Sequence, residues 1–110
     1  MPELDRKAIR RNFEEAVNMT AAEIEAWLET PESKKVGFRR DGTGESVGHA
    51  SGRRIAAILK SRTAELGDDD YAHMRKAVGF VRRHLAQEPA IVATSRWRYS
   101  LMNWGHDPLK

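Results

Sequence analysis

Residues 68–87 read DDDYAHMRKAVGFVRRHLAQ, a pattern typical of one long helix at the centre of a molecule. Apolar side chains recur at intervals of three or four residues, which places them on one helical face. They are Tyr71, Met74, Val78, Val81 and Leu85. The aspartates at the start suit the positive end of a helix dipole. We therefore predict a central helix over residues 69–87.

Two further residues of this helix indicate contacts beyond that face. Phe80 lies roughly opposite the apolar seam and predicts packing on a second side. Gly79 costs about 1 kcal/mol relative to alanine inside a helix. We therefore expect a neighbouring helix to approach closely at Gly79.

Helical spacing also predicts four other helices, over residues 3–17, 20–30, 51–66 and 95–104. Thr20 and Glu23 form a capping box at the start of the second helix, and Thr94 or Ser95 caps the last. No segment shows the alternation of a β-strand. Because a chain of 110 residues suits one domain, we predict a single compact all-α domain of four to five helices.

The core expected from these four helices consists of apolar residues at helical spacing. They are Ile9, Phe13, Ala16, Val17, Ile24, Trp27, Leu28, Ile55, Ile58, Leu59, Trp97, Leu101 and Trp104. The chain has no cysteine, which excludes disulfides and thiol catalysis and fits a reducing compartment. No stretch approaches about 18 apolar residues and no secretory pattern begins the chain, so we expect a cytoplasmic protein without membrane contact.

Residues 31–50 break the helical pattern. Four glycines fall within the 11 residues 42–52, and the apolar residues of this region are isolated anchors. These anchors are Val36, Phe38 and Val47. We predict a long glycine-rich basic loop between the second and third helices, and loops of this length are often functional.

The positive charge belongs to the middle of the chain, although the net charge is only +3. Residues 1–33 contain four basic and eight acidic side chains, whereas residues 34–62 contain eight basic and two acidic ones. An excess of this kind favours a polyanionic partner, because neutralising phosphates releases counterions. A solvated basic loop is the alternative explanation.

The segment Ser51-Gly52-Arg53-Arg54 follows the loop at the expected start of the third helix. Free amides, the helix dipole and two guanidinium groups would converge there, as a phosphate site requires. The alternative is that both arginines pair with the acidic first two helices. The residues predicted to bind nucleic acid are Lys34, Lys35, Arg39, Arg40, Ser51, Gly52, Arg53 and Arg54.

Two other basic motifs have structural explanations that we favour. Basic pairs at residues 75–76 and 82–83 repeat after seven positions and could track phosphates, but their stems also suit the flanks of the core seam. Residues 96–99 interleave arginines with aromatic rings, as in single-strand binders. Trp97 nevertheless shares a helical face with Leu101 and Trp104, so we expect the tryptophans in the core.

Catalytic and metal-binding motifs are not found. The spacing of a nucleotide-binding P-loop is absent. His73 and His84 would lie about 16 Å apart along one helix, too far to share a metal ion. Ser51 and His49 are close in sequence, but no orienting acid can be assigned to them. We therefore predict no enzyme, no metal and no cofactor.

Four segments resemble a family of small bacterial proteins of unknown function that are often labelled DNA-binding. They are GHASGRRI at residues 48–55, YAHMRK at 71–76, RHLAQ at 83–87 and WRYSLMNWGHDP at 97–108. The resemblance covers nearly the whole chain. It implies the DNA-binding label but no mechanism and no functional residue.

These observations predict a non-catalytic nucleic-acid-binding protein, with duplex DNA as the expected partner. Contacts mainly to phosphate imply weak sequence preference and steep salt dependence. The competing hypothesis is a protein–protein interaction or self-association module that uses the acidic first helices and the basic middle. A helix-turn-helix remains open only between the third and fourth helices, because the preceding loop is too long.

Overall fold

The computed structural model describes residues 5–39, 42 and 44–110. Within them the chain forms α1 (Arg6–Ala16), α2 (Ala21–Leu28), α3 (Pro31–Lys35), α4 (Val47–Lys60), a 3₁₀ turn η1 (Thr63–Glu65), α5 (Asp68–Leu85) and α6 (Arg96–Asn103). These described residues contain no strand, which confirms the all-α class. The radius of gyration, 13.8 Å, is close to the roughly 13 Å of a compact domain of this size.

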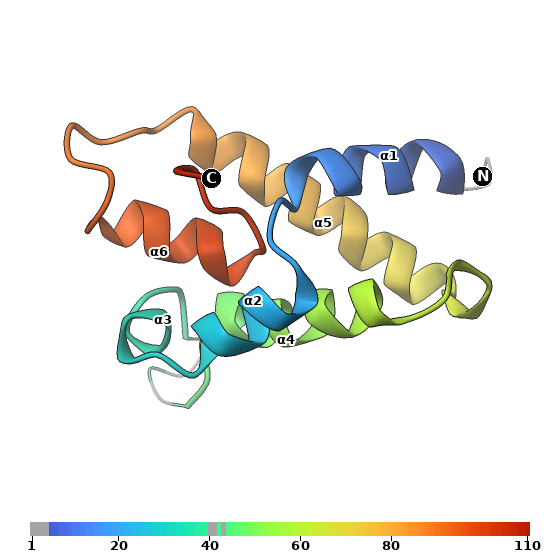
Figure 1. The fold of residues 1–110 in the computed structure, drawn as a ribbon, viewed down its shortest axis with the longest axis horizontal. Helices are drawn as coiled ribbons and strands as arrows, with labels where there is room; N and C mark the ends of the chain where they lie inside the picture. Colours follow the sequence, from blue (N-terminus) through green and yellow to red (C-terminus); the bar gives the residue numbers. More distant parts are fainter. Residues whose placement is uncertain (1–4, 40–41, 43) are drawn as a thin grey trace.

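Two helix pairs build the core. α1 packs mainly on α5 and α2 on α4, while α6 packs against α2, α3 and α4 and also contacts α5 (Figure 1). The predicted seam of α5 is buried at Tyr71, Met74, Val78 and Val81. The second contact predicted at Phe80 is confirmed, because its ring stacks on Trp104 at 4.4 Å between centroids.

Local signals placed several helix ends correctly. The Thr20 hydroxyl accepts from the Glu23 amide at 3.1 Å, and the Glu23 carboxylate accepts from the Thr20 amide at 2.8 Å. This capping box is the predicted one. At α6 the Ser95 hydroxyl accepts from the Arg98 amide at 3.0 Å, which makes Ser95 the cap.

Most residues predicted in the core are buried, and Trp97 packs against them. Three apolar residues expected to lie inside are exposed instead: Phe38, Leu59 and Leu85. The last two sit near the C-terminal ends of their helices, where fewer neighbouring elements cover them. Phe38 is 71% exposed and lies between α3 and α4.

The long loop predicted over residues 31–50 is not confirmed. Thr30 caps α3, which starts at Pro31, a residue whose missing N–H is tolerated in a first turn. Ser46 caps α4 by accepting from the His49 amide at 3.0 Å, so this helix starts at Val47 and not at residue 51. Helices therefore occupy both ends of the predicted loop.

Close approach of helices occurs at Gly52 of α4 and not at Gly79. A Cβ atom at Gly52 would lie 2.5 Å from the Asn103 carbonyl oxygen, a distance that real Cβ atoms do not show. A Cβ atom at Gly79 would meet only the flexible end of Arg83, at 3.2 Å. The expectation for Gly79 was wrong, since no neighbouring helix touches it there.

A buried amide links three helices behind this contact. Asn103 Oδ1 accepts from Trp27 Nε1 at 2.7 Å and from the Ser33 hydroxyl at 2.5 Å. Its amide nitrogen donates to the Ser33 carbonyl at 3.1 Å. Asn103 is 1% exposed, so these bonds hold α2, α3 and α6 together where water does not compete.

None of the described helices is long and apolar enough to cross a bilayer.

Candidate phosphate-binding groove

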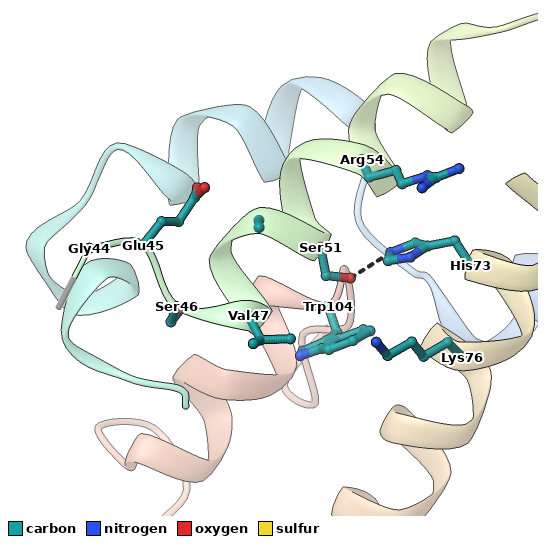
Figure 2. A pocket seen from close by; sticks show the side chains of 10 residues that line it. Gly44, Glu45, Ser46, Val47, Ser51, Arg54, His73, Lys76 and Trp104 are labelled. Atoms are coloured by element: carbon teal, nitrogen blue, oxygen red, sulfur yellow. Dashed lines mark hydrogen bonds between the residues drawn. The ribbon is translucent and has the colours of Figure 1, made fainter. Parts of the chain in front are cut away.

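Three adjoining cavities form a groove along α4 and α5. The largest, about 650 Å³, lies between α4, α5 and the ring of Trp104 (Figure 2). A second cavity of about 230 Å³ shares Val47, Lys76 and Trp104 with it. A third, of about 310 Å³, shares residues 44–46 and extends toward α3. We call these three cavities together the basic groove.

Four cationic side chains from three helices line the basic groove, together with Arg39 from the segment between α3 and α4. Lys34 borders the cavity near α3, Arg54 and Lys76 line the largest, and Arg83 lines the remaining one. Arg54 lies 3.4 Å from the Asp70 carboxylate, a long and partly exposed ion pair. The structure places no carboxylate of the described residues in an ion pair with the other three. Most of this positive charge is therefore available to a ligand.

A hydroxyl–imidazole pair closes one wall of the largest cavity. Ser51 Oγ and His73 Nε2 lie 2.8 Å apart, joining α4 to α5 (Figure 2). Burial lowers the pKa of His73 below its usual value, and the positive charges of Arg54 and Lys76 lower it further. The imidazole is therefore neutral near pH 7 and can act as a hydrogen-bond donor or acceptor.

Glu45 is the one carboxylate among the described residues that line the groove, and its charge is already neutralised. Arg53 donates to it with two nitrogens, one of them at 2.8 Å, and His49 contacts it as well. The bond from Arg53 lowers the pKa of Glu45 to about 2 despite partial burial, and His49 contributes. Glu45 stays ionised at any physiological pH but is turned toward these partners.

The predicted segment Ser51-Gly52-Arg53-Arg54 does not begin a helix. Ser51 and Gly52 are buried inside α4, whose first turn starts at Val47. The free amides expected there are absent, because the backbone of this segment already belongs to the helix interior. The internal pairing that we considered does occur, but Arg53 pairs with Glu45 and Arg54 with Asp70, not with the first two helices.

The remaining predicted residues lie around α3. Lys34 and Lys35 form its last turn and are exposed. Arg39 donates to the Gly44 carbonyl at 2.7 Å and to the Lys34 carbonyl, so its guanidinium group holds the chain between α3 and α4. Arg40 lies outside the described residues. Of the predicted set, Lys34, Arg39, Ser51 and Arg54 border the basic groove.

Sequence reasoning did not assign His73, Lys76, Arg83 or Trp104 to the site. The seven-residue repeat of basic pairs contained Lys76 and Arg83, but we favoured a structural role for it. That repeat was the available signal, because residues seven apart lie on the same side of a helix. His73 and Trp104 reach the groove from segments far apart in the chain, and no local pattern marked them.

The fold and the groove define a class of small all-helical protein with a cationic groove between two of its helices. Within that class, the chain belongs to the family DUF3140, described as a protein of unknown function, which matches residues 12–102. Membership in an uncharacterised family is thereby confirmed. No curated protein and no solved structure matches the chain.

Proposed function

We propose that this chain is a non-catalytic nucleic-acid-binding protein of the bacterial cytoplasm, with duplex DNA as its expected partner, and that the basic groove contacts phosphates. One observation carries the proposal. Lys76 is exposed, has no ion pair among the described residues, and lies where two cavities meet between Arg54 and Arg83. An unpaired cation flanked by two others on a concave surface favours an anionic ligand.

The spacing of these cations suits a regular polyanion. Lys76 and Arg83 are seven residues apart on α5, about 10 Å along the helix axis. Phosphates of one DNA strand advance about 3.4 Å per nucleotide along the duplex, so the two side chains match phosphates about three nucleotides apart. Arg54 adds a third contact from α4.

Residues predicted from the sequence keep supporting roles in this proposal. Lys34 and Lys35 extend the positive surface beyond the third cavity, where the strand would leave the groove. Arg53 holds Glu45 away from the ligand, which reduces repulsion. Ser51 supports His73 through their hydrogen bond. These side chains would contact the phosphate backbone of the nucleic acid and not the base edges, so we expect weak sequence preference.

The test is fluorescence anisotropy with a labelled 20 base-pair duplex over a series of salt concentrations. The groove variant is Lys76→Ala/Arg83→Ala. The matched control is Lys7→Ala/Arg11→Ala, which removes the same two residue types from exposed positions of α1, on another face. We expect the groove variant to bind more weakly and its log–log salt slope to flatten by about two units, because each lost phosphate contact changes the slope by about 0.9.

Equal losses in the groove variant and the control would show that only net charge matters and would refute the groove as the site. Absence of duplex binding at low salt would refute the proposed function. In that case the protein-interaction hypothesis would take first place, with the acidic excess of residues 1–33 and the basic middle of the chain as its candidate features.

A further inference from the structure

The Trp104 ring, which borders the largest cavity, has an indole N–H without an acceptor among the described residues. The chain has three tryptophans. Trp27 Nε1 donates to Asn103 at 2.7 Å, and Trp97 Nε1 donates to the His84 carbonyl. Trp104 is 4% exposed, yet its Nε1–H has no acceptor among the described residues. The nitrogen atom itself is not closed off from solvent, so this N–H is free to donate to a ligand in the cavity.

Other donors and cations line the same cavity. The nitrogen lies at the edge of the cavity beside Val47, and the ammonium end of Lys76 points toward the Trp104 ring (Figure 2). Arg54 and His73 line the opposite wall. Arg54, His73 and Lys76 therefore line the same cavity as the indole. Glu45 is the one carboxylate among the described residues of its lining, and Arg53 donates to it.

We propose that this cavity binds a phosphate monoester, the group carried by a free nucleoside monophosphate or by the 5′ end of a strand. The inference rests on the proposed nucleic-acid function and adds a preference for ends. A monoester carries nearly two negative charges, which match Arg54 and Lys76, and its three terminal oxygens accept from several donors at once. The about 650 Å³ of the cavity lies within the usual range for small-molecule sites and leaves room for a sugar and base.

A terminal phosphate fits this place better than an internal one. The Trp104 indole is almost wholly buried, so only a group at the end of a chain can reach it without carrying nucleotides on both sides into the cavity. Internal phosphates would lie further along the groove, where Arg83 is exposed. The two kinds of contact can therefore coexist on one strand that ends in the cavity.

The first experiment titrates the full chain with deoxyadenosine 5′-monophosphate and, separately, with deoxyadenosine. Binding is followed by calorimetry and by the ¹⁵N–¹H resonances of the three indole groups. We expect the monophosphate to bind, the nucleoside not to bind, and the Trp104 indole proton to move downfield while those of Trp27 and Trp97 stay in place. Lys76→Gln should weaken binding at least about tenfold, since a charge-assisted hydrogen bond is lost.

The matched control is Arg75→Gln, which removes one exposed charge from the neighbouring position of α5 outside the groove. It should change monophosphate affinity less than about twofold. Equal losses in Lys76→Gln and Arg75→Gln, or an unchanged Trp104 resonance at saturation, would overturn the site.

A second arm compares 20 base-pair duplexes with 5′-phosphate or 5′-hydroxyl ends. Preference for the phosphorylated duplex supports strand ends as the source of the ligand. Binding of the monophosphate without any duplex binding supports the cavity with a free nucleotide as its ligand and refutes the nucleic-acid function. Equal binding of both duplexes, with no binding of the monophosphate, overturns the inference and leaves the proposed function intact.

Discussion

Replacing Gly52 with alanine tests the closest contact between helices in this fold. The new Cβ atom would lie 2.5 Å from the Asn103 carbonyl oxygen and 2.9 Å from Leu28 Cδ2. Because the first contact is with backbone, α4 and α6 must separate, and over-packing of this kind costs up to about 3 kcal/mol. Alanine's better helix propensity offsets about 1 kcal/mol of that. We expect the free energy of unfolding to fall by about 2 kcal/mol.

Thermal unfolding followed by circular dichroism measures this loss. For a domain of this size 1 kcal/mol corresponds to about 4 °C, so we expect Tm to fall by about 8 °C. Gly79→Ala is the matched control, since its Cβ atom would meet only the movable end of Arg83. It should raise Tm by about 4 °C through helix propensity alone. A Gly52→Ala protein as stable as wild type, or two variants with the same Tm, would refute the close approach of α4 to α6.

Two further predictions concern buried polar groups. Asn103→Ala removes the acceptor of Trp27 and the partner of Ser33. We expect urea unfolding to show a free energy of unfolding lower by about 2–4 kcal/mol. A loss below about 1 kcal/mol would contradict the role of this amide. Burial, with nearby positive charge, lowers the pKa of His73 in the folded chain below its ordinary 6.5, so the unfolded chain takes up this proton first as pH falls. The free energy of unfolding should therefore be highest above about pH 6.5 and should decline as the pH falls toward the lower pKa of the folded chain. Urea titrations between about pH 7.5 and 5.5 measure this decline, and we expect His73→Gln to make it smaller. An unchanged pH dependence in the variant would show that His73 is not its source.

The helices that the sequence predicted best are those with complete local signals. α2 has its capping box at Thr20, and α5 has an acidic first turn and a regular apolar seam. Such signals act within one or two turns of chain, so they can be read without knowledge of the rest of the molecule. The burial of Leu85 was mispredicted, because whether a neighbour covers the end of a seam depends on the packing of other elements.

The region between α2 and α4 was mispredicted because its glycines were interpreted locally. Glycine disfavours a helix in isolation, and four of them suggested a loop through residue 50. Gly48 and Gly52 lie inside α4 instead, facing Trp104 and the Asn103 carbonyl. A Cβ atom would clash with backbone at Gly52 and press on the Trp104 ring at Gly48, so packing against the end of α6 explains both glycines.

The basic groove also combines features that local sequence determines with features that depend on tertiary packing. The sequence by itself determined the helical class, several caps, most of the core and the concentration of positive charge in the middle of the chain, since these follow from composition and from contacts a few residues apart. Only the tertiary structure decided that Arg53 is paired with Glu45, and that Ser51 and Arg54 meet His73, Lys76 and Trp104 around one cavity. These residues come from three separate segments, and their distances exist only once α4, α5 and α6 have packed together.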